Sequence, residues 1–357
     1  MAQYPGTEQD RRVDAGQLAT LIGAVFATCG MRNEDAKILA ESLVGADLRG
    51  IHSHGVLRVP DYVEKLTTGG VDPRGAPRVV SGRGAVVVVD GGNSMGQIGG
   101  TFAMSRAIEL AHEHGLGAAA LRGSNHCGAM DRYAMMALAH GMIGLAATNA
   151  LPTMAPWGGA EKIVGINPIA VALPGGEERP VVLDVAFGAT AHGKIRVYEQ
   201  KGHPLPEGWA LDSDGVPTTD PAAALLGLIL PIGAFKGVGL AMIAGMLSSL
   251  LSGAAYGLES GNMIDGAVAG SDGQFFLAID VASFEDPVRF GARADVIVRQ
   301  VHGARRAPGV DRLYVPGEME AEFTDAYRRE GIPLNAQTLA DLSAVARSRG
   351  VAVPADW

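Results

Sequence analysis

The chain has 357 residues, of which 47% are hydrophobic and 19% are charged, and this composition predicts a globular protein with more than one domain. The net charge of −9 argues against a nucleic-acid partner. The two cysteines, Cys29 and Cys127, do not make a disulfide framework, so we expect a reducing, cytoplasmic compartment. The start of the chain, Met1 to Pro5, lacks the basic and then apolar pattern of a secretory signal.

Two amphipathic helices are predicted near the start of the chain. Apolar residues recur at helical spacing from Asp14 to Cys29, and Asp14 with Gln17 resembles a capping box. Asn33 is placed to cap the second helix. We therefore expect a helical domain over residues 1–80, on which residues 318–357 pack, in place of the strand that opens a nucleotide-binding βαβ unit.

The middle of the chain mixes strands and helices without a regular order. Buried strands are predicted at 85–89, 117–121, 142–148, 169–173, 181–184 and 275–280, and helices at 56–66, 101–114, 131–140 and 288–302. Residues 96–100 are interpreted as a glycine-rich segment that precedes a helix, and residues 209–221 as a polar, turn-rich surface loop. The mixture predicts an α/β domain over residues 81–317 that is not doubly wound.

An uncharged segment separates Lys236 from Glu259. Within it, residues 237–255 are largely apolar, and their number approaches the ~20 residues of a membrane-spanning helix. However, these residues include four glycines and three serines, and no aromatic belt flanks them. We therefore interpret the segment as a helix from the middle of a large domain, and we expect no membrane partner.

The usual nucleotide-binding motifs are incomplete. The nearest match to G-x-G-x-x-G, from Gly237 to Met242, lacks the third glycine. A P-loop is nearly matched from Gly188 to Lys194, but Ile195 stands where a hydroxyl should ligate magnesium. A Rossmann fold and a nucleoside triphosphatase are both disfavoured, and Lys194 remains as a lysine near a pocket.

The histidine pairs do not predict a metal centre. His112 and His114 fall near a helix end on different faces, and His52 and His54 lie on either side of a serine. Neither pair has the further ligands that a zinc site requires, so we expect no metal.

A polar cluster follows the second helix, with His54, Arg58 and Tyr62 at intervals of four residues. On a helix this spacing places the three side chains on one face. A guanidinium matches the two oxygens of a small carboxylate, so the cluster favours a carboxylate site. A turn at 52–54 whose side chains bond the local backbone remains an alternative.

The stretch from Gly123 to Gly128 holds His126 on flexible backbone between a predicted strand and a predicted helix. Catalytic residues often occupy such junctions, and His126 is our candidate for proton transfer, although a structural histidine fits the same pattern. Lys236 stands alone in an uncharged region and must meet an anion or reach solvent.

Together these stretches resemble the malate/L-lactate dehydrogenase family, whose members lack the Rossmann fold. The family includes ureidoglycolate, sulfolactate and diketogulonate dehydrogenases and reductases of cyclic imino acids, and the likeness to the ureidoglycolate enzymes is especially close around His126 and residues 158–168. The resemblance covers nearly the whole chain and rests on His52-Ser53-His54-Gly55-Val56 with Arg58, Ser124-Asn125-His126-Cys127-Gly128, Pro156-Trp157-Gly158-Gly159-Ala160-Glu161, Asn167-Pro168, Leu183-Asp184-Val185-Ala186, Gly193-Lys194, Lys236-Gly237 and Pro316-Gly317-Glu318.

The resemblance implies NAD or NADP bound by a mixed sheet unlike the Rossmann fold, in a homodimer with sites near the subunit interface. It implies that His126 is the proton donor or acceptor. The substrate carboxylate would lie near Ser53, His54, Arg58 and Tyr62. Cofactor contacts would fall at Asn149, Ala150, Asp184, Val185, Ala186, Lys236, Arg293 and Asp295.

We therefore expect reversible hydride transfer between NAD(P)H and C2 of a small 2-oxo acid. His126 as imidazolium gives a proton to the oxygen, and its neutral ring removes that proton in reverse, because an ordinary histidine pKa of ~6.5 allows both forms. Arg58 holds the carboxylate. Two alternatives stay open: a reductase of a cyclic 2-imino acid, where His54 matters more than His126, and a non-catalytic relative that binds a carboxylate or nucleotide.

Overall fold

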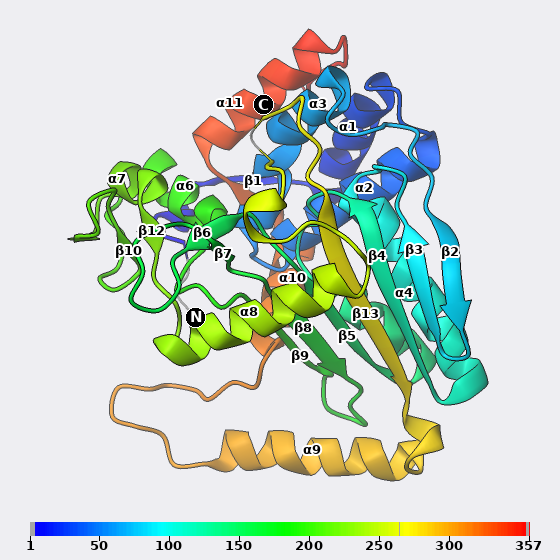
Figure 1. Ribbon diagram of the computed structural model, residues 1–357. Helices are drawn as coiled ribbons and strands as arrows, with labels where there is room; N and C mark the ends of the chain where they lie inside the picture. The colour runs from blue at the N-terminus through cyan, green and yellow to red at the C-terminus, as the bar shows by residue number, and fades with distance from the viewer. Residues whose placement is uncertain (1–3, 264, 355–356) are drawn as a thin grey trace.

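The computed structural model describes residues 4–263, 265–354 and 357, so Met1 to Gln3, part of the segment examined for a secretory signal, lie outside the described residues. At its centre is a mixed seven-stranded sheet (Figure 1). In spatial order its strands are β2 (Arg78–Arg83), β3 (Val86–Asp90), β4 (Leu116–Ser124), β13 (Asp272–Asp280), β5 (Met142–Thr148), β8 (Ile169–Leu173) and β9 (Val181–Val185). β3 and β4 run parallel, and the other neighbouring pairs are antiparallel. The predicted α/β class with a non-Rossmann mixed sheet is confirmed.

Helices cover both faces of this sheet (Figure 1). α4 (Gly96–His114) and α5 (Asp131–Met136) pack on one face, and α8 (Phe235–Leu250) packs against β13 and β5 on the other. A Cβ on Gly117 of β4 would lie 2.1 Å from the Ala107 carbonyl oxygen, and one on Gly144 of β5 would lie 2.0 Å from that of Ala134. Glycine on these strands therefore lets α4 and α5 approach the sheet closely.

A helical layer from both ends of the chain caps one end of the sheet. It contains α1 (Ala15–Thr28), α2 (Asn33–Leu48), α3 (Val59–Thr68), α10 (Glu318–Glu330) and α11 (Ala336–Ser348). The short strands β1 (Arg11–Val13) and β14 (Ile332–Leu334) pair antiparallel and join the two ends. Leu18, Leu39 and Leu342 are buried in the core of this layer.

The helix caps agree only in part with the sequence patterns. The Asp14 side chain accepts from the Gln17 amide and caps α1, as predicted. The expected cap at Asn33 is wrong, because Arg32 is the N-cap residue of α2 and Asn33 is already helical without a side-chain cap bond. An asparagine one position inside the helix no longer has the extended backbone that a cap requires.

A third group of elements contacts α8 through β7 (Val164–Gly165) and the turn at His52–His54 through α6 (His192–Gln200). It also contains α7 (Pro221–Leu226) and the small strands β6 (Pro152–Met154), β10 (Ala210–Leu211), β11 (Pro217–Thr218) and β12 (Leu228–Ile229). The surface loop expected at 209–221 therefore contains two short strands, β10 and β11. Single-turn 3₁₀ helices occupy Thr7–Gln9, His52–His54, Val56–Arg58, Ala137–His140, Gly257–Glu259 and Val281–Ser283.

The interpretation of α8 as a helix buried on all sides is wrong. Its inner face packs on the sheet, but Leu240, Ile243 and Leu250 on its outer face are 52%, 67% and 59% exposed. None of the helices in the described part of the chain is long and apolar enough to span a membrane. The apolar composition of α8 therefore marks a second surface that the chain itself leaves uncovered.

α9 (Pro287–Gly303) lies apart from the main body (Figure 1). Its buried Asp295 accepts hydrogen bonds from the amides of Gly176, Glu177 and Glu178, in the turn between β8 and β9. These amides lower the pKa of the Asp295 carboxyl. Asp295 thus anchors α9 to the sheet.

Candidate active site

The corner that holds His126 is built by close backbone packing. β4 ends at Ser124, and the glycines on either side of the corner, Gly123 and Gly128, adopt positive φ angles of 60° and 75°. The first turn of α4 lies against the same corner, because a Cβ on Gly96 would fall 2.1 Å from the Asn125 carbonyl oxygen. The glycines expected to precede that helix are therefore its first residues, and they position the corner.

The Asn125 side chain fixes the corner from the other side. Its amide nitrogen donates to the Ser94 carbonyl at 2.9 Å, and its carbonyl oxygen accepts from the Gly270 amide at 2.7 Å. Asn125 is 3% exposed, so these bonds are protected from water. The backbone that carries His126 is thus tied to segments distant in the sequence.

The His126 ring is oriented by Tyr62. The Tyr62 hydroxyl lies 2.6 Å from Nδ1 of His126, and the side-chain amide of Gln97 donates to the same hydroxyl at 3.1 Å. The Tyr62 oxygen has lone pairs for both neighbours, so a neutral ring that is basic at Nε2 carries its proton on Nδ1 and donates it to Tyr62. Nε2 of His126 has no hydrogen bond among the described residues and remains for a ligand.

The electrostatic surroundings keep His126 neutral when the site holds no anion. Burial, the neighbouring His54 ring and the Arg58 guanidinium, in that order, lower its pKa well below the ordinary value. His54 stacks on His126 with ring centres 5.5 Å apart, and burial with Arg58 lowers the His54 pKa to about 3. Ser53 Oγ lies 2.9 Å from Nδ1 of His54 and fixes that ring.

Arg58 is buried beside the two histidines with part of its guanidinium free. Its Nε donates to the Ser53 carbonyl at 2.9 Å, and Nη1 donates to Asp61 at 3.3 Å. Nη2 makes no hydrogen bond within the described residues, and it approaches α6 where a Cβ on Gly193 would lie only 2.4 Å away. A buried arginine with an unused donor edge can hold a small carboxylate.

Two adjoining cavities meet at this cluster. His54, Arg58, Tyr62 and His126 line one of about 160 Å³. A larger one, of about 630 Å³, lies beside it and is lined by Ser53 and Lys194 among others. The residues that line both cavities are His54, Gly128, Ile166, Pro168 and Ala191.

This pair of cavities fits an elongated dinucleotide. The combined space suits a ligand larger than the acid alone. Lys194 lines the larger cavity without a carboxylate partner among the described residues, and its ammonium lies over the rings of Tyr4 and Trp209. A half-buried lysine without a carboxylate partner suits an anionic group such as a pyrophosphate.

Several residues expected to contact the cofactor line these cavities. Asn149 and Ala150 line the smaller one, and residues 184–186 line the larger one. The Asn149 side chain, however, is used within the protein, since it donates to the Ala255 carbonyl and accepts from the Gly273 amide. The Asp184 carboxylate accepts from the Asp131 amide, and burial raises its pKa to about 7.

Other expected contacts lie elsewhere in the chain. Lys236 is exposed at the start of α8 and lines neither cavity. Arg293 is exposed on α9, and Asp295 is engaged with the turn between β8 and β9. Within a single chain these three residues are not brought to His126.

The structure also reveals site residues that the sequence patterns missed. The smaller cavity is also lined by Lys65, Asp272 and His192. Gln97 donates to the hydroxyl of Tyr62, which lines the same cavity. Lys65 could have been predicted from the sequence, because it lies seven residues after Arg58 and hence on the same helix face. Gln97 and Asp272 could not have been predicted, because only the packing of α4 and of β13 brings them to the site.

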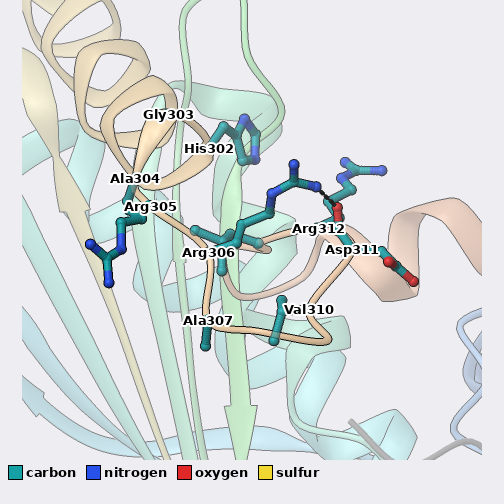
Figure 2. Close-up of a pocket in the computed structure, with 10 residues that line it drawn as sticks. His302, Gly303, Ala304, Arg305, Arg306, Ala307, Val310, Asp311 and Arg312 are labelled. Carbon is teal, nitrogen blue, oxygen red and sulfur yellow. Dashed lines mark hydrogen bonds between the residues drawn. The ribbon is translucent and has the colours of Figure 1, made fainter.

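A further hollow, of about 950 Å³, is not part of this site. The loop after α9 encloses it, and Figure 2 shows that loop curving back on itself from His302 to Arg312. Arg306 donates to the Asp311 carbonyl and Arg312 to Glu322, while Arg305 points away from the loop. The hollow shares no lining residue with the cavities at His126.

Comparison with known proteins identifies the chain. Residues 13–343 match the family model described as malate/L-lactate dehydrogenase. The malate dehydrogenase of Pyrococcus horikoshii is 36% identical over 349 residues, which cover 95% of this chain and 96% of the relative. Its solved structure superposes with a TM-score of 0.90 and covers 99% of both chains.

Two further relatives have different substrates in their names. The ureidoglycolate dehydrogenase (NAD(+)) of Escherichia coli is 32% identical over 308 residues, covering 86% of this chain and 88% of the relative. The Δ1-piperideine-2-carboxylate reductase of Pseudomonas syringae is 32% identical in sequence, and its solved structure superposes with a TM-score of 0.83. The match covers 94% of this chain and 99% of the reductase. The ureidoglycolate dehydrogenase is named as an NAD(+) enzyme, and another relative, a (2R)-3-sulfolactate dehydrogenase, is named as an NADP(+) enzyme.

The fold, the site and these matches define an NAD(P)-dependent oxidoreductase that acts on 2-hydroxy acids and the corresponding 2-oxo acids. The chain belongs to the malate/L-lactate dehydrogenase family. The expected family, enzyme class and cofactor class are thus confirmed.

Proposed function

We propose that His126 exchanges a proton with the C2 oxygen of a small 2-oxo or 2-hydroxy acid, while Arg58 holds its carboxylate. One observation carries the proposal: Tyr62 occupies Nδ1 of His126, which leaves Nε2 for a ligand, and Arg58 with its unused donor edge lines the same cavity. A carboxylate on Arg58 places C2 one bond away, within reach of the imidazole. Ser53 and His54 shape the carboxylate end.

The lowered pKa of His126 gives the two directions different requirements. For oxidation the ring is already the neutral base that takes the hydroxyl proton. For reduction the ring must first be protonated, and a substrate carboxylate promotes this because it offsets the positive field of Arg58. The proton donor therefore forms together with the enzyme–substrate complex, which corrects the expectation of an ordinary histidine pKa.

The nicotinamide cofactor supplies the hydride that C2 accepts, or takes it up in reverse. We propose that residues 149–150 and 184–186 contact it through the walls they form, and that Lys194 faces its pyrophosphate. Lys236, Arg293 and Asp295 remain proposed cofactor contacts only if a second subunit carries them to the site.

We propose that the enzyme is a cytoplasmic homodimer. Each chain combines a helical domain, made of residues 1–80 and 318–357, with a cofactor- and substrate-binding domain over 81–317. The exposed apolar face of α8 and the apolar residues of α9, of which Val288 is 81% and Ile297 is 61% exposed, support a second copy as the partner. Apolar surface of this extent is normally covered in solution.

Replacement of His126 tests the proposed mechanism. His126→Ala should lower kcat by about 10²–10⁴-fold, the usual contribution of a general acid or base. His112→Ala is the matched control, because His112 is exposed at the end of α4, where its ring bonds His140 outside both cavities. Near-normal turnover of the His126 variant would remove the proposed role.

Replacement of Arg58 tests the carboxylate site separately. Arg58→Ala should chiefly raise KM, because a carboxylate held equally in the ground state and the transition state contributes to capture. Asp61 would keep a partner in this variant, since Arg196 also bonds it at 3.1 Å. An unchanged KM would place the carboxylate elsewhere.

A second candidate is reduction of a cyclic 2-imino acid, and the structural similarity to the piperideine-carboxylate reductase favours it. Oxidation of NADH and NADPH should be followed with matched 2-oxo acids and cyclic imines. Turnover of imines alone, with His126→Ala still active, would select the second candidate. No turnover with any acid or imine would favour a non-catalytic relative.

A further inference from the structure

α3 and its N-cap residue, Arg58, present a row of three polar side chains to the smaller cavity. Arg58, Tyr62 and Lys65 all line it, and their spacing of four and three residues keeps them on one helix face. At 1.5 Å per residue, Arg58 and Lys65 are separated by about 10 Å along the helix, with Tyr62 between them. Because Tyr62 bonds His126, the reacting position lies between the two cationic side chains.

The Lys65 end of the cavity also contains a carboxyl group. Asp272 is the first residue of β13, its Cα is paired with that of Ser124, and it lines the same cavity. No hydrogen bond or direct ion pair involves its carboxyl among the described residues. Lys65 is 3% exposed and donates to the Val268 carbonyl, which uses one of its three protons.

Lys65 and Asp272 thus face one space without touching each other. A group that fills the space should accept from the ammonium and donate to the carboxyl. An amide does both through its oxygen and its nitrogen, whereas a methyl group leaves both charged side chains unpaired, which is costly in a buried cavity.

We propose that Lys65 and Asp272 form a subsite for the substrate's side chain, which selects 2-oxo and 2-hydroxy acids that carry a neutral carbamoyl group, as an amide or a ureido group. The subsite rests on the proposed function, since it assumes a carboxylate on Arg58 and C2 beside His126. A second carboxylate on the substrate is disfavoured, because it would meet Asp272.

Two acids of nearly equal size and shape test the subsite: oxaloacetate and its amide, 2-oxosuccinamate, with 2-oxobutanoate as the acid that lacks a polar end. At pH 8 the wild-type enzyme should prefer the amide over oxaloacetate by about tenfold in kcat/KM, and Asp272→Asn should remove that preference. Asp280→Asn, at the other end of β13, is the matched control and should keep it.

The contrary outcomes are distinct. A wild-type preference for oxaloacetate, or an unchanged ratio in Asp272→Asn, overturns the subsite. An equal loss for all three acids with a raised KM for NAD(P)H also overturns it, because Asp272 would then hold an amide or hydroxyl of the cofactor. Calorimetric binding of the two acids measures the same preference without turnover, so that failed catalysis with a retained preference supports the subsite and rejects only the proposed reaction.

Discussion

α4 and α8 are two apolar, glycine-containing helices on opposite faces of one sheet, and they serve different purposes (Figure 1). The apolar side chains of α4 are largely buried by its own chain, and its first residues reach the backbone of His126 and the hydroxyl of Tyr62. α8 is covered on one side only, so that Ile243 is 67% exposed. One helix therefore builds the site, and the other presents a surface.

Their glycines show why composition alone does not separate the two helices. A Cβ on Gly96 of α4 would collide with the Asn125 carbonyl oxygen, whereas a Cβ on Gly239 of α8 would meet nothing within 4 Å. The first glycine permits a close approach that the site requires. The second has no such neighbour in the chain itself.

Alanine at these two glycines should give the largest contrast. Gly96→Ala should lower the free energy of unfolding by about 3 kcal/mol or more and abolish activity, because rigid backbone stands at 2.1 Å from the new Cβ. Gly239→Ala should raise it by up to about 1 kcal/mol, since alanine is the better helix former. Urea unfolding and kcat measure both. A tolerated Gly96→Ala would mean that α4 does not fix the corner.

A charge on the outer face of α8 should have an intermediate effect. Ile243→Glu should convert a dimer into monomers, because each buried isoleucine contributes about 1.5–3 kcal/mol and a carboxylate opposes burial. Sedimentation over a range of concentrations measures the dimer constant. The control is Ala344→Glu, on an exposed position of α11. Equal association of both variants would place the interface elsewhere.

The local parts of the fold were predictable, because their causes lie within a few residues. The cap at Asp14 needs only Gln17, and Arg58 and Tyr62 share a face by helix geometry alone. The corner at His126 was also predictable, since glycines mark the positions where its backbone turns. These features are read from sequence neighbours.

The parts that were missed depend on distant segments. Gly96 was expected to precede α4 because glycine disfavours helices, but its packing against Asn125 places it inside the helix. The bonds from Asp295 to the turn between β8 and β9 had no sequence signal, because that turn is distant in the chain. Asp272 had no motif, because only the pairing of β13 with β4 brings it to the cavity.

The smallest predicted effect concerns the second contact of α4 with the site, from Gln97 through Tyr62 to His126. Tyr62→Phe should lower kcat by about tenfold, since it leaves Nδ1 of His126 and the Gln97 amide unpaired, a loss of about 1–3 kcal/mol. Tyr198→Phe, in α6 and outside both cavities, is the control.

The pH profile separates this role from a structural one. Oxidation needs the neutral ring, and the lowered pKa of His126 means that kcat/KM for oxidation stays level at neutral pH and falls only well below pH ~6.5. Reduction needs the protonated ring and falls as pH rises. Nδ1–H of His126 donates to the Tyr62 oxygen, and this bond is stronger when the ring is charged, so Tyr62 favours the protonated ring. Its removal should lower the pKa of His126 further and move the acid limb for oxidation to lower pH, whereas an unmoved limb would limit Tyr62 to packing.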